Sequence, residues 1–219
     1  LLLTGGEVFL RKDFREIFEH ARERGFLITL FTNGTLIDAA TADWLAERPP
    51  FSIEISLYGA TPKTHDRVTR VPGSYDRCLH GIRLLAERGL PLLLKTMAMR
   101  PNRDEIQEMR RFAEGELGVE FRFDGMINPR IDGSLTPLEV RLSPFEVVDL
   151  DIRDPRRSAE WVRFCEHFSR PPGGDGGLLY GCGGGRNAFA VDPAGRLGAC
   201  VLARRETYDL RSGTFREGW

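Results

Sequence analysis

Hydrophobic and polar positions follow two alternating periods along the first half of the chain. Short runs of strand-forming residues are followed by stretches in which apolar residues recur at helical spacing. The strand pattern covers residues 1–4, 26–31, 51–57, 91–97 and 119–123, and the helical pattern covers 13–24, 38–47, 74–88 and 102–117. This order predicts parallel strands joined by right-handed helical crossovers, and therefore an α/β fold.

Two architectures fit this pattern. Residues 26–31 and 91–94 show little alternation, which is typical of strands covered on both faces. We expect a partial (β/α) TIM-like barrel, and a doubly wound open sheet fits almost as well. In either architecture the functional loops follow the carboxyl ends of the strands.

The pattern changes after about residue 125. A polar loop, a short helix that begins at Ser143, a second helix and a Pro- and Gly-rich linker follow, the last two at residues 159–168 and 171–177. Residues 187–191 and 196–202 then predict a β-hairpin. We therefore divide the chain into a barrel domain, a helical and Gly/Pro linker and a small β-hairpin extension, over residues 1–150, 151–180 and 181–219.

Composition narrows the function classes. The chain of 219 residues is 41% hydrophobic and carries 31 Lys and Arg against 32 Asp and Glu, a net charge of −1. This predicts a globular core and argues against nucleic-acid binding through a broad basic face. No apolar run approaches the length of a membrane span. Four cysteines are too few for a disulfide scaffold, so we expect a reducing, cytoplasmic location.

The first candidate site is Thr4-Gly5-Gly6-Glu7, directly after a predicted strand. Two adjacent glycines leave the backbone bare, so a ligand can approach the main chain. The Glu7 carboxylate beside them could receive a small cationic group such as an ammonium. The alternative is a tight turn in which glycine is required only by its backbone conformation.

Further candidates follow later strands. Ser56 ends the third strand, on the same edge as Gly6, and its hydroxyl could bind a carboxylate or a ribose. His65 could act as a general base, although a lone histidine in a loop is more often a solvated residue or a cap. We expect Lys95 to form a salt bridge at the rim. Asp124 follows the last strand and could point into a barrel mouth.

The cysteines fall into two groups. Cys182 and Cys200 are separated by twelve residues, a glycine and four residues, and the predicted hairpin lets them converge. Two thiolates are half a ligand set for zinc or an iron–sulfur cluster, whereas the alternative is two reduced thiols or a disulfide. Cys78 and Cys165 lie among apolar residues at helical spacing, so we predict that both are small core residues.

Taken together, the motifs resemble those of a radical S-adenosylmethionine enzyme with a SPASM-type extension. Thr4–Val8 resembles the GGE motif, which holds the methionine ammonium of the cofactor, and Thr32–Thr35 resembles the TNG turn. The stretch from Ile55 through Tyr75 resembles the family's ISLDG…HD…R…GSF segment, with Tyr58 where Asp is common. Cys182 through Cys200 resembles half of the SPASM motif.

The resemblance assigns residues to cofactors. It implies S-adenosylmethionine contacts from Gly5, Gly6, Glu7, Asn33, Ser56 and Arg70, the last through the cofactor's carboxylate. It implies that Cys182 and Cys200 ligate an auxiliary [4Fe–4S] cluster. The CxxxCxxC triad of the catalytic cluster would precede Leu1, and further SPASM cysteines would follow Trp219. We therefore expect a fragment with both ends cut, unable to assemble the catalytic cluster alone.

The resemblance also implies an activity. The intact enzyme would generate a 5′-deoxyadenosyl radical and abstract hydrogen from a peptide or protein, as an oxidoreductase-type peptide maturase supplied with electrons by a flavodoxin or ferredoxin. The loop Asn128–Ser134 could line the substrate channel. The alternatives are a non-catalytic peptide-binding scaffold or truncated remnant, and a structural zinc protein; upstream sequence and metal content separate them.

Overall fold

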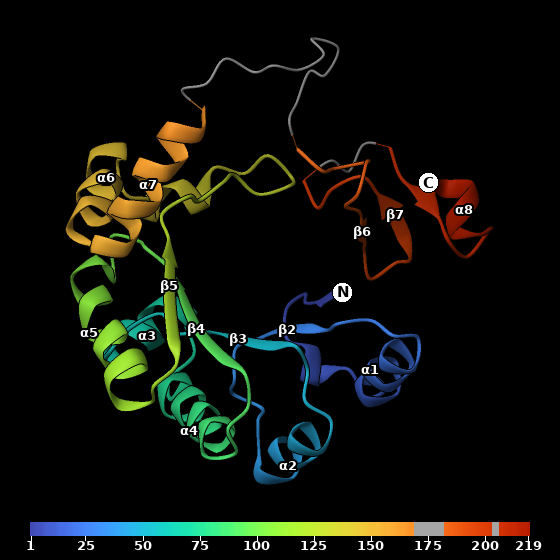
Figure 1. The fold of residues 1–219 in the computed structure, drawn as a ribbon, viewed down its shortest axis with the longest axis horizontal. Helices are drawn as coiled ribbons and strands as arrows, with labels where there is room; N and C mark the ends of the chain where they lie inside the picture. The colour runs from blue at the N-terminus through green and yellow to red at the C-terminus, as the bar shows by residue number, and fades with distance from the viewer. Residues whose placement is uncertain (169–181, 203–205) are drawn as a thin grey trace. The chain divides into compact units, whose positions relative to one another are not determined.

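The computed structural model describes residues 1–168, 182–202 and 206–219. These residues form two compact units, Leu1–Asp154 and Pro155–Trp219 (Figure 1). No helix in the described ranges is long and apolar enough to cross a membrane.

The first unit is built on a parallel five-stranded sheet with the strands in sequence order. Its strands are β1 (Leu2–Leu3), β2 (Thr29–Thr32), β3 (Ser52–Ser56), β4 (Leu92–Met97) and β5 (Glu120–Asp124). Its helices are α1 (Phe14–Glu23), α2 (Ala39–Glu47), α3 (Pro62–Thr69), α4 (Ser74–Glu87), α5 (Ile106–Arg110) and α6 (Pro144–Arg153). Short 3₁₀ turns lie at Val8–Leu10, Arg103–Glu105 and Thr136–Val140, and a π-helical turn, Arg111–Glu116, follows α5.

Helix starts follow local side-chain chemistry. The Asp38 carboxylate accepts the Thr41 N–H at 2.7 Å and caps α2, as its sequence position predicts. Ser143 and Glu146 form a reciprocal capping box at the start of α6. Thr61 caps α3, with Pro62 in the first turn. Helix α3 itself was not anticipated, because its eight residues carry no regular apolar stripe.

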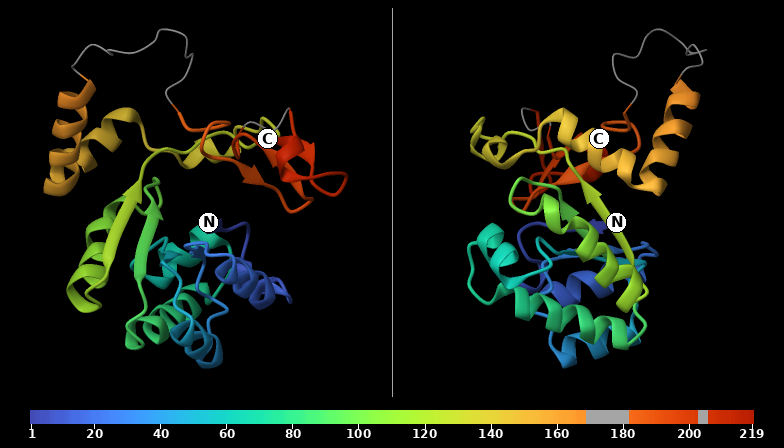
Figure 2. Two further views of the ribbon diagram at one scale, coloured as in Figure 1. Left: turned by 45° about the vertical axis from the view of Figure 1, so that its right-hand side comes forward. Right: turned by 90° about the vertical axis from the view of Figure 1, so that its left-hand side faces the viewer.

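The two faces of the sheet differ. Leu30, Ile55, Leu94 and Phe121 belong to one core cluster together with residues of α1, α2, α4 and α5. These four helices lie on the same side of the sheet (Figures 1 and 2). Alternate residues face the other way and are mostly polar. The expectation of strands covered on both faces is therefore wrong for residues 26–31, where Phe26 and Leu27 are exposed, whereas Leu92, Leu93 and Leu94 in the second run are all buried. The helices on one side support the partial barrel over the doubly wound sheet.

Helix α4 packs directly on the turn that follows β2. A Cβ atom added to Gly81 would collide with the Gly34 carbonyl oxygen and would also lie 3.0 Å from Cβ of Ile37. Gly34 itself has a φ of 74°. Backbone therefore meets backbone at this contact, and only glycine fits position 81.

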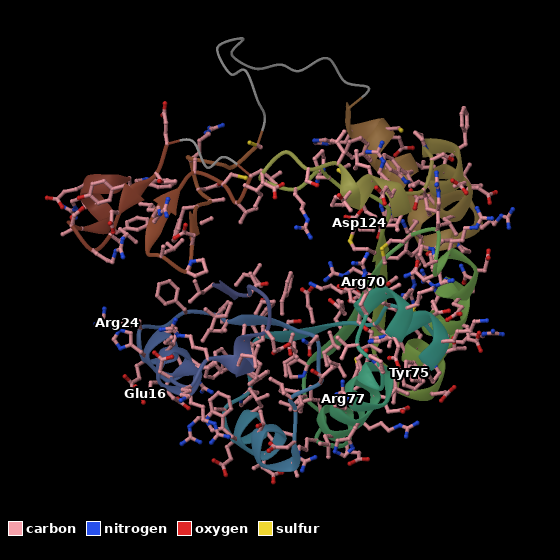
Figure 3. All side chains as sticks on the ribbon, turned by 180° about the vertical axis from the view of Figure 1, so that it is seen from behind. Glu16, Arg24, Arg70, Tyr75, Arg77 and Asp124 are labelled. Carbon is pink, nitrogen blue, oxygen red and sulfur yellow. The ribbon has the colours of Figure 1, made fainter. Side chains whose placement is uncertain are left out.

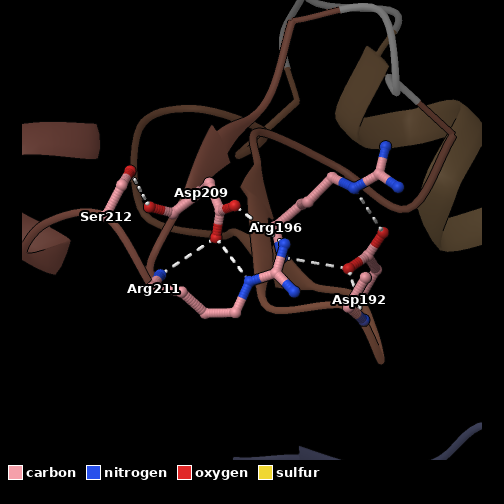
Figure 4. Close-up of polar contacts among 6 residues, drawn as sticks. Asp192, Arg196, Asp209, Arg211 and Ser212 are labelled. Atoms are coloured by element: carbon pink, nitrogen blue, oxygen red, sulfur yellow. Dashed lines mark hydrogen bonds and ion pairs between the residues drawn. The ribbon is translucent and has the colours of Figure 1, made fainter.

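The second unit contains α7 (Pro155–Phe168) and an antiparallel sheet of β6 (Ala190–Val191), β7 (Arg196–Gly198) and β8 (Tyr208–Asp209), followed by α8 (Phe215–Gly218). Strands β6 and β7 confirm the predicted hairpin. The Asp192 carboxylate holds its turn by accepting the N–H groups of Ala194 and Arg196, each at 2.9 Å. Figure 4 shows this turn beside the pair that Arg211 forms with Asp209 in β8.

Two of the expected elements begin at other residues than the sequence predicts. The helix expected over 159–168 begins at Pro155, and the strand expected over 26–31 begins at Thr29, with Phe26 and Leu27 exposed. Cys165 is exposed, so its prediction as a core residue is wrong: helical spacing defines an apolar stripe but not what covers it. The Pro- and Gly-rich linker at 171–177 lies outside the described residues. The division into three domains stays a prediction.

Candidate functional site

The predicted ligand-binding residues follow the carboxyl ends of the parallel strands. Gly5 and Gly6 follow β1, Asn33 follows β2, and Ser56 is the last residue of β3. Asp124 ends β5, and Arg70 follows α3 in the crossover after β3. In a sheet of parallel strands these ends share one edge, and that edge carries the loops that bind ligands.

Gly5 and Gly6 present open main chain at this edge. Their φ angles are 108° and 53°, conformations that favour glycine. Both residues are exposed, and a Cβ atom added to either would meet nothing within 4 Å. The conformational reason for glycine therefore holds, and the backbone is also accessible to a ligand.

The Glu7 carboxylate holds this loop against the turn after β2. Glu7 is 8% exposed. Its Oε1 accepts the Thr32 hydroxyl at 2.7 Å and the Phe9 N–H at 3.2 Å, and its Oε2 accepts the Asn33 N–H at 2.7 Å. The carboxylate thus fixes the glycines relative to Asn33. Direct binding of an ammonium by Glu7 stays a prediction.

The side chain of Asn33 uses its oxygen in the turn and leaves its NH₂ group available to a ligand. Its Oδ1 accepts the Thr35 N–H at 2.9 Å and the Thr35 hydroxyl at 2.7 Å, which fixes the turn. Its side-chain NH₂ group makes no hydrogen bond to any residue that the structure describes. Asn33 can therefore donate to a ligand without losing a contact of its own.

Asn102 ties the end of β3 to the end of β4. It is 1% exposed, and its Nδ2 donates to the carbonyls of Tyr58 and Met97 at 3.1 and 3.0 Å. Its Oδ1 accepts the Met99 N–H at 2.8 Å. The sequence predicts only that a helix begins at this position, because the Tyr58 carbonyl that Asn102 reaches lies 44 positions away.

Glu105 fixes the loop that precedes α3. Its carboxylate accepts the N–H groups of Ala60 and Thr61 at 2.7 and 3.2 Å and the hydroxyl of Thr64. A carboxylate at the start of a helix is also stabilised by the helix dipole. Like Asn102, Glu105 was missed, because nothing in its neighbouring sequence marks a contact across 45 positions.

His65 and Asp66 build the corner between α3 and α4. His65 is 2% exposed, its Nδ1 accepts the Tyr58 N–H at 3.2 Å, and burial lowers its pKa. The interpretation of His65 as a solvated loop residue is therefore wrong. Asp66 accepts the N–H groups of Gly73 and Tyr75 at 2.6 and 2.9 Å, and the Tyr75 bond is the main cause of its lowered pKa.

Arg70 and Asp124 are the exposed charged candidates at this edge (Figure 3). Arg70 has a φ of 59°, and among the described residues it is the one non-glycine with a positive φ. Such strain persists where the surroundings impose it and is concentrated at functional positions. Asp124 accepts the Met126 N–H at 2.8 Å through Oδ1, which leaves Oδ2 available to a ligand.

A cavity of about 690 Å³ opens at the same edge, large enough for a small organic ligand. It lies among α3, the end of β4, the loop after β5 and the turn Thr136–Val140. Six of its lining residues are Tyr58, Thr69, Met97, Met126, Asn128 and Arg130. Asn128 and Arg130 come from the loop expected to line a substrate channel.

Cys182 and Cys200 converge in the second unit. A Cβ atom added to Gly184 would lie 3.7 Å from Sγ of Cys182 and 3.6 Å from Cβ of Cys200, so this glycine lies between them. Both are free cysteines, and the Leu202 N–H donates to Sγ of Cys200 at 3.4 Å. A cavity of about 330 Å³ adjoins Cys182. No group of three metal-ligating side chains occurs within the described ranges. Cys182 and Cys200 therefore offer two sulfur ligands there.

Cys78 differs from this pair. It is fully buried on α4, as predicted, and burial raises the pKa of its thiol to about 12. A thiol in this state is neither a nucleophile nor a metal ligand at neutral pH.

Solved structures share this fold. The chain aligns with Streptococcus suis SuiB at a TM-score of 0.68 and 15% identity, over 99% of this chain and 54% of SuiB. It aligns with anSMEcpe bound to AdoMet at a TM-score of 0.63 and 17% identity, over 99% of this chain and 65% of that one. At these identities the likeness shows the fold alone.

Curated proteins are similar in sequence. The mycofactocin maturase MftC of Mycobacterium tuberculosis is 27% identical over 227 residues, 99% of this chain and 57% of that protein. The PqqA peptide cyclase of Granulibacter bethesdensis is 30% identical over 217 residues, 93% of this chain and 55% of the cyclase. The chain thus spans little more than half the length of either relative. The profile of the radical SAM superfamily matches residues 1–113, which include β1 to β4 and most of the edge described above. The chain belongs to the radical SAM superfamily.

Proposed function

We propose that the carboxyl edge of the sheet binds S-adenosylmethionine, and that the protein uses this cofactor to abstract hydrogen from a peptide or protein substrate. One observation carries the proposal: Glu7 holds the open Gly5–Gly6 main chain beside the free amide of Asn33. This arrangement lies within the part of the chain that matches the superfamily. A main-chain acceptor beside a side-chain donor suits the ammonium and carboxylate of an amino acid.

We assign each of the other groups at this edge to one part of the cofactor. The Gly5 and Gly6 main chain accepts from the ammonium, Arg70 binds the carboxylate, and Ser56 binds the ribose. S-adenosylmethionine held here would supply, beside a reduced [4Fe–4S] cluster, the radical that abstracts hydrogen. The chain positions the substrate C–H bond and excludes water. Asp124 is our candidate for taking up a proton in the cavity mouth.

We further propose that Cys182 and Cys200 ligate an auxiliary [4Fe–4S] cluster in a SPASM-type extension. Their convergence around Gly184 and the N–H···S bond from Leu202 support this, because such bonds are typical of iron–sulfur ligands. A peptide substrate is suggested by the printed names of MftC and the PqqA peptide cyclase, and by SuiB bound to its precursor peptide SuiA. The flavodoxin or ferredoxin donor and the cytoplasmic location stay predictions.

Equilibrium dialysis of radiolabelled S-adenosylmethionine against the 219-residue chain tests the cofactor site. We expect Ser56→Ala and Arg70→Gln each to weaken binding about tenfold, since each removes a polar contact to the ligand. Arg111→Gln, at an exposed arginine on the helical side of the sheet, is the matched control. If both site variants bind S-adenosylmethionine with the affinity of the wild type, the assignment is overturned.

Anaerobic reconstitution with iron and sulfide tests the auxiliary site. We expect a charge-transfer absorbance band of the kind typical of thiolate-bound clusters. The band should be lost in Cys182→Ala and Cys200→Ala and kept in Cys165→Ala. Tight zinc binding through the same two cysteines, without iron uptake, would support the structural zinc protein instead.

A further inference from the structure

An ionic network crosses the sheet face that the helices leave uncovered. The Lys95 ammonium on β4 lies 3.1 Å from Oε2 of Glu54 on β3 and 2.7 Å from the ring centroid of Phe31 on β2. Arg122 on β5 reaches Oε1 of Glu54 at 3.3 Å. Side chains from four neighbouring strands therefore meet on one face.

Stability alone does not account for this network. The equivalent face of a barrel is normally filled by layers of branched apolar side chains. The Glu54 and Lys95 side chains are only 14% and 23% exposed. Charges held this far from water gain less from their pairing than they lose in hydration unless further partners complete their bonds.

The network has more donors than acceptors. Both Glu54 oxygens are occupied, one by each cation. Within the part of the chain that the structure describes, Lys95 directs one N–H to Glu54 and stands over Phe31, so its ammonium keeps a further N–H. Arg122 touches Glu54 and, at 3.7 Å, Glu120, and it is 56% exposed. Burial is the main cause of the lowered pKa of Lys95 and Arg122 adds to it, whereas the Glu54 carboxylate acts in the opposite direction.

The network adjoins the proposed cofactor edge. Lys95 is the register partner of Ser56, and its carbonyl accepts the Leu57 N–H at 2.8 Å. Two residues further along the same face of β4, Met97 lines the 690 Å³ cavity and is the register partner of Asp124. A group bound at Lys95 would therefore lie one pleat below the cavity.

We propose that Lys95 and Arg122 bind a carboxylate of the substrate, the side chain of an acidic residue in a peptide, and so position the neighbouring C–H bonds at the cofactor edge. The peptide context rests on the proposed function, whereas the carboxylate site rests on the network alone. A cationic ligand is disfavoured, because Lys95 and Arg122 already place two positive charges beside the Glu54 carboxylate.

The lysines make the test direct. The chain has three, Lys12, Lys63 and Lys95, and the first two are exposed. In protein labelled with ¹³C-lysine, we expect the Lys95 Cε–Hε signal to shift progressively on titration with N-acetylglutamic acid α-amide. Lys12 and Lys63 are internal controls and should not move. N-acetylglutamine α-amide, which has the same shape without the charge, should leave all three signals in place.

Variants of the lysines measure how much Lys95 contributes to the affinity for the acid. Ligand-observed NMR should show the acid bound at least about tenfold more weakly to Lys95→Met, the factor expected for one charge-assisted bond, and unchanged by Lys63→Met. The wild-type titration needs no variant, so it stands even if Lys95→Met fails to fold.

The outcomes separate the two proposals. A Lys95 signal that ignores the acid, or that responds equally to the amide, overturns the carboxylate site. An equal response to inorganic phosphate would make the network a general anion site and overturn the substrate assignment. If the chain fails to bind S-adenosylmethionine while Lys95 still responds to the acid, only the proposed function fails.

Discussion

Replacing Glu7 with alanine would break the link between the loop after β1 and the turn after β2. The carboxylate accepts hydrogen bonds from Phe9, Thr32 and Asn33, and two of these partners lie 25 and 26 positions away. The Thr32 side chain is 4% exposed, so water cannot easily replace the lost acceptor. The turn would keep its own bonds but lose its fixed position beside Gly5 and Gly6.

The magnitude follows from those bonds. A hydrogen bond to a charged group contributes about 1.5–3 kcal/mol net, and the Phe9 bond, at 3.2 Å, is the weakest of the three. The two long-range bonds together give an expected loss of about 3–6 kcal/mol in the free energy of unfolding. Glu7→Gln keeps one acceptor oxygen but turns an NH₂ toward a donor, so we expect a loss of about 2–3 kcal/mol.

Urea unfolding followed by Trp44 fluorescence measures this loss in the first unit. Trp44 lies on α2 against Phe14 and Phe18, while Trp161 and Trp219 belong to the second unit, so the assay uses a Trp161→Phe/Trp219→Phe background. Glu108→Gln, at an exposed position on α5, is the control and should change stability by less than about 0.5 kcal/mol. If Glu7→Ala costs no more than this control, the carboxylate does not hold the edge together.

Three further predictions concern the surroundings of the site. Gly81→Ala should destabilise the first unit by at least about 3 kcal/mol, because its Cβ atom would collide with Gly34. Gly115→Ala, with open space around it, should stabilise the unit by about 0.5–1 kcal/mol, and urea unfolding measures both changes. Because burial lowers the pKa of His65, the unfolded chain takes up the proton first, so the free energy of unfolding should fall as the pH drops below about 6.5, and a pH series on His65→Gln should lack this component. Cys78 should stay unmodified by iodoacetamide in the native protein, as read by mass spectrometry, because its thiol pKa is about 12; rapid labelling would show that α4 opens.

Elements that depend on local signals were predictable from the sequence. Asp38 begins α2 where expected, because its carboxylate caps a helix that starts at the next residue. The positions of Gly5, Asn33 and Ser56 at this edge were also predictable, since each ends a strand or follows one within two residues, and parallel strands share their carboxyl edge. In such cases the cause of the structure lies within a few positions of the residue.

The supports of the site were not predictable in this way. Asn102 and Glu105 act on residues 41 to 45 positions earlier, and nothing near them in the sequence marks those partners. His65 was misjudged for a related reason. The sequence does not predict helix α3, so His65 is interpreted as a loop residue. In the structure His65 belongs to α3 and lies between the Tyr58 and Tyr75 rings.

Strand β4 shows why an apolar run can conceal a functional face. Residues 91–94 read as covered on both sides, and Leu92, Leu93 and Leu94 are indeed all buried. Leu92 and Leu94 join the helical core, but Leu93 does not, and two positions beyond it Lys95 meets Glu54 and Phe31. A single charge on a strand predicts a salt bridge at the rim. The contact between Lys95 and Glu54 confirms the salt bridge. The second cation comes from Arg122, 27 positions later, so only the register of three strands shows two cations sharing one carboxylate. Pairing accounts for Glu54, and the surplus of donors leaves room for an anion that none of the described residues supplies.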